Sequence, residues 1–265
     1  MSTSLTTADI PTWFTAIAVL SLALAIVCAG WVALDVVRRP QHMGVMNVVW
    51  PVVMLFGSVA WLAFYLRFGR ARASAQRRGR EHDGDEAHDG YEAHDGHEGH
   101  EGHEAPPSRT ERMVSTATGT NHCGAGCTLG DVTADAVLVL LPLLVPAALF
   151  PHEIYAGWIL GTVFAFAFGV VFQYFAIAPM RGLPLVPGLL AALKADAASI
   201  AAWQVGMIGF MAIVQLAVLP HWLGGHAPPS TAAYWFLMQC AMVLGFACSY
   251  PVNAWLERQG IKESM

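Results

Sequence analysis

The feature that most constrains this fold is a series of apolar runs, several of which reach the length needed to cross a lipid bilayer. A membrane-spanning helix needs about 20 consecutive apolar residues. Of the 265 residues, 55% are hydrophobic and only 12% are charged, whereas about a quarter of the residues in a soluble domain are charged. Helices satisfy their own backbone hydrogen bonds within lipid. The sequence therefore predicts an all-α, polytopic membrane bundle of about six helices.

The expected membrane segments divide into two groups, separated by a polar stretch. A two-helix membrane hairpin is expected in residues 1–70, a cytoplasmic loop in residues 71–120, and a four-helix membrane domain in residues 121–265. No Lys or Arg precedes the first apolar run, so we expect a retained helix rather than a cleaved signal peptide. Residues 189–198 are expected to form a turn at the membrane surface. The six segments are expected at about 11–34, 45–66, 132–150, 156–177, 199–219 and 233–250.

The distribution of arginine predicts the orientation in the membrane. Residues 67–80 contain six arginines in fourteen positions. Basic residues are enriched in cytoplasmic loops, so this stretch and the loop after it are expected in the cytoplasm. Six crossings then place both termini in the cytoplasm, in a multi-pass protein of the inner (plasma) membrane. The pair Arg38 and Arg39 does not fit this arrangement, because it falls in the loop expected outside.

A tract rich in histidine and carboxylates follows the arginines. Residues 81–104 carry ten acidic residues and no Lys or Arg. With almost no apolar residues, the tract is predicted to be disordered. Its imidazoles and carboxylates suit weak, exchangeable binding of zinc, nickel, cobalt or copper(II), although an acidic solvating linker explains the composition as well. The histidines are His82, His88, His94, His97, His100 and His103.

The stretch NHCGAGCTLGDVTAD, residues 121–135, contains the most specific candidate site. His122, Cys123 and Cys127 supply an imidazole and two thiols, which are ligands that zinc and copper(I) accept. Asp131 follows as a further candidate ligand. In a helix the two cysteines share one face. Three soft ligands are one short of a closed tetrahedral zinc site, and a glycine-rich helix cap whose cysteines only pack is the alternative.

Further polar and sulfur-containing residues in the apolar segments could line a path for an ion. Thioethers select copper(I) over harder cations, and ionisable groups within membrane segments are functional candidates by default. The alternatives are methionine packing in the core and a proline kink satisfied by neighbouring helices. Lys194 and Asp196 are expected at the membrane surface. The candidate path residues are Asn47, four positions before Pro51, and Asp135, Gln204, Met207, Met211, Met238 and Met242.

Four stretches of the chain resemble a known bacterial family of integral membrane proteins, catalogued as domain of unknown function 4396. The stretches are RRPQHMGVMNVVWPV (38–52), HCGAGCTLGD (122–131), KADAASIAAWQVGM (194–207) and SYPVNAWLERQGIKESM (249–265). The resemblance implies a helical membrane protein and brings no established activity with it.

The leading hypothesis is a membrane protein that handles or transports a transition-metal ion, copper or zinc. The histidine-rich loop would collect ions and His122, Cys123 and Cys127 would receive them. The alternatives are a thiol redox protein that uses the two cysteines and a non-catalytic membrane assembly protein. An enzyme is not expected, because no phosphate loop, catalytic triad or dinucleotide motif is present. The expected partners are the lipid bilayer, a metal ion and, through Gly157 and Gly161, a second copy of the chain; nucleic acid is not expected.

Overall fold

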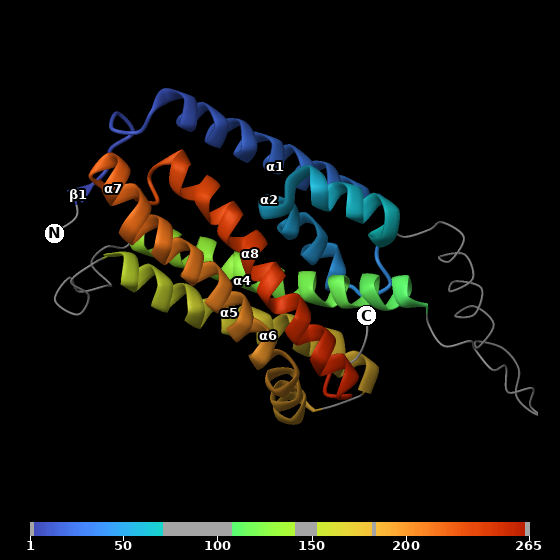
Figure 1. Ribbon diagram of the computed structural model, residues 1–265. Helices are drawn as coiled ribbons and strands as arrows, with labels where there is room; N and C mark the ends of the chain where they lie inside the picture. The colour runs from blue at the N-terminus through green and yellow to red at the C-terminus, as the bar shows by residue number, and fades with distance from the viewer. Residues whose placement is uncertain (1–2, 71–107, 141–152, 182–183, 263–265) are drawn as a thin grey trace, which may run out of the picture.

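The computed structural model describes residues 3–70, 108–140, 153–181 and 184–262, which form a bundle of long helices (Figure 1). This confirms the all-α membrane architecture; the histidine-rich tract lies outside the described residues. The elements in chain order are β1 (Thr3–Ser4), α1 (Thr12–Arg38), α2 (Met46–Phe64), η1 (Tyr65–Gly69), α4 (Arg109–Leu140), α5 (Glu153–Arg181), α6 (Leu185–Ile213), η3 (Val214–Val218), α7 (Leu219–Leu223), β2 (Gly225–His226) and α8 (Ala232–Arg258).

Helix α4 is the central helix of the bundle. Six helices in the described part of the chain are long and apolar enough to cross a membrane, and α4 packs against four other elements: α2, α5, α6 and α8. Every residue of α4 from Gly119 to Thr128 is buried. The middle part of this helix, the most polar of the long helices, is thus enclosed by protein.

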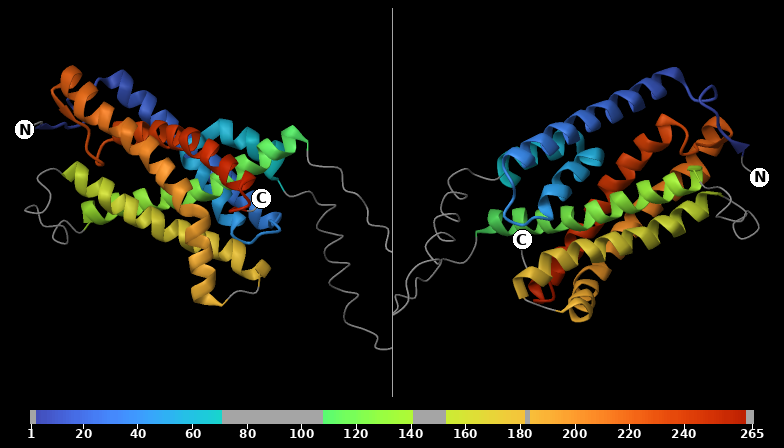
Figure 2. Two further views of the ribbon diagram at one scale, coloured as in Figure 1. Left: turned by 60° about the horizontal axis from the view of Figure 1, so that its bottom comes forward. Right: turned by 180° about the vertical axis from the view of Figure 1, so that it is seen from behind.

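The α2 segment is bent back on itself and forms a helical hairpin, which we call the α2 hairpin (residues 46–69). Ser58 has φ 48° and ψ −130°, which breaks the helix at that point. The ring of Trp50 lies 5.3 Å from the ring of Tyr65, although a straight helix would separate these residues by about 22 Å. Both ends of the hairpin therefore lie at the same end of the bundle, as Figures 1 and 2 show.

Polar contacts hold the base and the tip of the α2 hairpin. At the base, Arg70 Nη2 lies 2.6 Å from Asp35 Oδ1, and the Tyr65 hydroxyl donates to Asp35 Oδ2 at 2.9 Å. This carboxylate raises the pKa of Arg70 further. Near the tip, the Leu55 carbonyl accepts a hydrogen bond from Gln239 Nε2 of α8 at 2.6 Å. Backbone groups freed by a helix break at membrane depth need such partners.

The α2 hairpin corrects the predicted topology. Thr3–Ser4 pair with Gly225–His226 at one end of the bundle, while the chain leaves α8 at the other end (Figure 1). Because α2 returns to its starting end, the two ends of the described chain lie at opposite ends of the bundle, whereas the sequence predicted both on one side. Among the described residues, every Lys and Arg lies near the end that holds the α8 C-terminus, which we call the basic end. Arg38 and Arg39 lie there too, so the pair no longer breaks the charge rule.

Helix α4 starts much earlier than the sequence indicated. It begins at Arg109, not near residue 132, so residues 109–120, assigned above to the loop, are helical. Residues 189–198 are also helical, within α6, rather than a surface turn. Their Ala, Leu and Lys residues are strong helix formers, and this propensity determines the local structure.

Candidate functional site

One face of α4 carries a buried row of polar side chains through the bundle. Its members are separated by three or four residues, so they lie above one another on the helix. From the first to the last the row extends about 29 Å, close to the roughly 30 Å thickness of the hydrocarbon core. We call this row the α4 seam. Its members, all at most 4% exposed, are Thr116, Thr120, Cys123, Cys127, Asp131 and Asp135.

Glycines allow the neighbouring helices to approach α4 closely. A Cβ atom placed on Gly126 would lie 2.8 Å from the Cα of Gly169 in α5, and one on Gly130 would lie 2.6 Å from the Cα of Ala165. A Cβ on Gly161 would lie 2.5 Å from Oδ1 of Asp131. The pair Gly157 and Gly161, expected to serve a contact between copies, therefore faces α4 of the same chain.

A buried lysine from the C-terminal tail meets the seam at Cys123. The Lys262 Nζ atom lies 2.5 Å from Asp196 Oδ1 and 3.0 Å from Cys123 Sγ. It also donates to Asn253 Oδ1 at 2.8 Å, and Asn253 Nδ2 donates to Ser199 Oγ at 2.7 Å. We call these five residues the Lys262 cluster. The side chains of Lys262 and Asp196 are both 0% exposed.

A tight turn after α8 directs Lys262 into the bundle. Gly260 has φ 66°, a left-handed conformation that glycine adopts without strain. The Ile261 N–H donates to the Leu256 carbonyl at 3.1 Å, as in a common helix C-terminal motif. Burial opposes the charge of Lys262, but the Asp196 carboxylate and the Cys123 sulfur outweigh it and raise the pKa of Lys262 above its ordinary value.

The far end of the seam contains two carboxyl groups. Asp131 and Asp135 are one helical turn apart, and the Tyr234 hydroxyl of α8 donates to Asp135 Oδ2 at 2.9 Å. Oδ2 of Asp131 is buried and has no hydrogen-bond partner among the described residues. Such an unpartnered buried oxygen is unusual in a folded protein and calls for an explanation.

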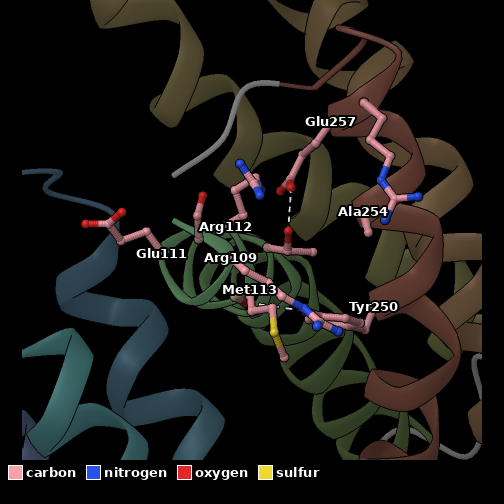
Figure 3. A pocket seen from close by; sticks show the side chains of 10 residues that line it. Arg109, Glu111, Arg112, Met113, Tyr250, Ala254 and Glu257 are labelled. Atoms are coloured by element: carbon pink, nitrogen blue, oxygen red, sulfur yellow. Dashed lines mark hydrogen bonds between the residues drawn. The ribbon is translucent and has the colours of Figure 1, made fainter. Parts of the chain in front are cut away.

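A pocket of about 900 Å³ opens at the basic end of the seam (Figure 3). Thr116, the first seam residue, donates to Glu257 Oε2 at 2.5 Å between the pocket walls, as the dashed line in Figure 3 marks. Three arginines are among the residues that line the pocket. The lining residues are Arg109, Glu111, Arg112, Met113, Ser115, Thr116, Tyr250, Ala254, Glu257 and Arg258. The pocket thus reaches the first residue of the seam at the basic end.

The predicted soft-ligand set is divided within the structure. Cys123 and Cys127 lie on the α4 seam, whereas the ring of His122 points toward α5 and packs edge-on at 6.0 Å from the ring of Phe172. Adjacent residues of a helix do not face each other. In the described part of the chain, no three His, Cys, Asp or Glu side chains gather as a metal site would require. Both cysteines are free and fully buried. The stretch is also mid-helix, not the glycine-rich cap or loop expected.

The predicted path residues have mixed positions. Asn47 lies in the first turn of α2, where it accepts from the Gln41 N–H at 2.8 Å and donates to the Gly44 carbonyl, so it is not at membrane depth. Thr128 reaches the Sδ atom of Met242 at 3.7 Å. Both polar atoms of Gln204 lack a hydrogen-bond partner among the described residues. Buried around the seam, without gathering on it, are Gln204, Met207, Met211, Met238 and Met242.

The sequence did not single out the residues that surround Cys123. Asp196 was expected at the membrane surface, and Lys262 was not among the candidate site residues. Asn253 and Ser199 attracted no attention, because a lone amide or hydroxyl in an apolar helix is common. Gly260 was an available signal for this position of Lys262. A glycine just past a helix end often reverses the chain direction, and here the reversal turns Lys262 back toward the bundle.

The chain was compared with known protein families, curated proteins and solved structures. Neither curated proteins nor solved structures gave a match. The resemblance stretch at residues 38–52 lies outside the part of the chain that the family comparison matches, whereas α4, α5, α6 and α8 lie almost wholly within it. The match extends over residues 113–262, more than half of the chain, and the protein therefore belongs to the family described as domain of unknown function 4396 (DUF4396).

Proposed function

We propose that this protein transports a transition-metal cation, zinc or copper(I), across the membrane along the α4 seam. The observation that carries the proposal is the row of buried thiols and carboxyl groups that follows α4 through the thickness of the bundle. Ionisable groups within membrane segments are costly and generally mark ion pathways or proton relays. The unpartnered oxygen of Asp131 supports a path better than a purely structural polar core.

The chemistry of the row favours a transition metal as the cargo. Cys123 and Cys127 provide sulfur ligands, followed by the harder oxygens of Asp131 and Asp135. Sulfur selects zinc and copper(I) over magnesium or calcium. Since no three His, Cys, Asp or Glu side chains gather among the described residues, we expect weak binding at each step, which suits an ion that is passed along the row. The histidine-rich tract at 81–104 would raise the local concentration of the ion before it enters the pocket.

We further propose that the basic end faces the cytoplasm of a bacterial cell, in the inner membrane. The clustering of Lys and Arg supports this orientation. The N-terminus would then face outward, together with the loop after α7, which has no Lys or Arg. The pocket lined by Glu257 would be the cytoplasmic entrance or exit of the path.

Flux measured in sealed vesicles tests the proposal. Purified protein is reconstituted with a zinc-sensitive dye inside, and a parallel sample contains a pH-sensitive dye. Asp131→Asn is expected to reduce zinc flux by roughly tenfold or more, because the amide keeps the shape and removes the charge. Asp9→Asn is the matched control, since Asp9 is exposed and lies outside the helices, and it should leave flux unchanged.

Two further results bear on the cargo. Deletion of residues 81–104 should weaken the apparent affinity for zinc without changing the maximal rate. Vesicles that pass neither zinc nor copper(I) would refute the metal proposal. Proton flux without metal flux would indicate that the seam conducts protons instead. Thiol alkylation with and without reductant shows whether Cys123 and Cys127 form a disulfide in vivo. A disulfide would favour the redox alternative.

A further inference from the structure

We propose that Cys123, Asp196 and Asn253 form a cation-binding site for zinc, and that Lys262 of the chain's own tail occupies it in this structure. The inference deepens the proposed function, because it names the first binding site on the path from the pocket. It begins from the coordination of the lysine. Its ammonium has acceptors from three helices: Cys123 Sγ of α4, Asp196 Oδ1 of α6 and Asn253 Oδ1 of α8. The ammonium of Lys262 thus occupies the point where α4, α6 and α8 each present an acceptor, which is the position that a bound cation would take.

Stability alone does not account for this buried lysine. An ion pair removed from water gains little or nothing over well-packed apolar side chains of the same volume. The pair of Lys262 and Asp196 is 0% exposed on both sides, so its desolvation is complete. Oδ2 of Asp196 has no hydrogen-bond partner among the described residues. The carboxylate therefore keeps one oxygen free, which a metal ion could use.

The lysine can leave while its acceptors stay in place. Lys262 lies beyond the end of α8, and the Gly260 turn holds it against the bundle through backbone bonds to Leu256. Cys123, Asp196 and Asn253 lie on three packed helices. An opening of the turn would remove the ammonium and expose the ligands, without any change in the helices. Segments held by few contacts open far more readily than a helical core.

The ligands indicate the class of ion. One sulfur and two kinds of oxygen form a borderline-soft set, and Cys and Asp are both common zinc ligands. Cys123 Sγ lies 3.2 Å from Asp196 Oδ1, close enough for one ion to contact both. The charges also balance. With lysine present, the ammonium neutralises the Asp196 carboxylate; with Zn²⁺ present, the ammonium leaves and the thiol proton is released, so Zn²⁺ faces a thiolate and a carboxylate.

Competition between zinc and Lys262 can be measured on the wild-type protein. The chain has two lysines, Lys194 and Lys262. Lys194 is exposed and serves as the internal control for an amine-acetylating reagent, with acetylation at each site read by peptide mass spectrometry. Without metal, Lys262 should react more slowly than Lys194 by roughly tenfold or more. Added Zn²⁺ should raise acetylation of Lys262 by roughly tenfold while Lys194 is unchanged, and Mg²⁺ should have no effect.

A direct measurement of zinc binding by purified variants is the second test of the site. Lys262→Met removes the competing charge at similar length, and the purified variant should bind one zinc ion per chain more tightly than wild type, by roughly tenfold or more. Lys262→Arg keeps the charge and should not gain affinity. In Lys262→Met combined with Asp196→Asn, the extra zinc should be lost. The acetylation arm needs no variant, so a poorly folding Lys262→Met leaves the inference testable.

The results separate this inference from the proposed function. Acetylation of Lys262 that is unaffected by zinc would overturn the inference, as would a folded Lys262→Met that binds no more zinc than wild type. Zinc flux that persists in vesicles alongside such a result would leave transport standing with a different entry site. Conversely, zinc that displaces Lys262 in a protein without flux would establish the site and refute transport.

Discussion

The closest backbone contact between α4 and α5 provides a sharp test of the packing. Gly130→Ala would place a Cβ atom 2.6 Å from the Cα of Ala165, where carbon atoms prefer about 3.5 Å or more. The helices would have to separate by about 1 Å. Overpacking of this kind costs about 1–3 kcal/mol, and the better helix propensity of alanine returns at most about 1 kcal/mol. The net loss of stability should be about 1–2 kcal/mol.

Gly209→Ala is the matched control, because Gly209 also lies within a long helix but nothing lies within 4 Å of its added Cβ. It keeps the gain in propensity and carries no clash, so it should be neutral or stabilising by up to about 1 kcal/mol. Thermal unfolding in one detergent, followed by loss of helical circular dichroism, compares the two. Gly130→Ala should melt about 2–8 °C below wild type. Equal melting temperatures for the two variants would refute the close packing of α4 on α5.

Three further predictions concern the hairpin, the seam and the topology. Ser58→Gly should stabilise the protein by about 0.5–1 kcal/mol in thermal unfolding, since glycine adopts positive φ without strain; an unchanged or lower melting temperature would contradict a break at this position. Tyr234→Phe should destabilise it by about 1–3 kcal/mol, because Asp135 loses its buried donor, and a neutral effect would contradict that hydrogen bond. Epitope tags at the two termini should be cleaved by protease from opposite sides of the membrane, whereas cleavage of both from one side would refute the α2 hairpin.

Hydropathy was sufficient to predict the architecture but not the path of the chain through it. A run of apolar residues indicates membrane depth, and residues 45–66 were long enough for a crossing. In this chain, the break at Ser58 makes the run return to its starting end. Gly57 and Ser58 form a Gly–Ser pair, a common site of helix kinks, but Pro51 is the more obvious candidate and lies within a continuous stretch of helix. The misfit of Arg38 and Arg39 with the charge rule was a second available sign of the hairpin.

The position of the candidate site was harder to predict for a related reason. Of the 23 residues from Arg109 to Asp131, 11 are Thr, Gly, Ser or Asn, which have weak helix propensity and low hydropathy. They were therefore read as a loop and a cap, although tertiary packing makes them the centre of the bundle. Cys123 and Cys127 were correctly expected to share one face if helical. The partners of Cys123 are Asp196 and Lys262, 73 and 139 residues away in the chain, a separation that no local pattern reveals.

The α2 hairpin and the polar face of α4 are best understood together. The aspartates and thiols of α4 are costly to expose to lipid, so the face that carries them needs protein around it. Glycines bring α5 against one side, and α6 and α8 cover others. The α2 hairpin closes the remaining side, where Trp61 Nε1 donates to Asn121 Oδ1 at 2.5 Å. The bend at Ser58 lets the hairpin cover α4 while both of its ends lie at the basic end of the bundle. The shielding of α4 and the access to it from the basic end thus depend on the same hairpin.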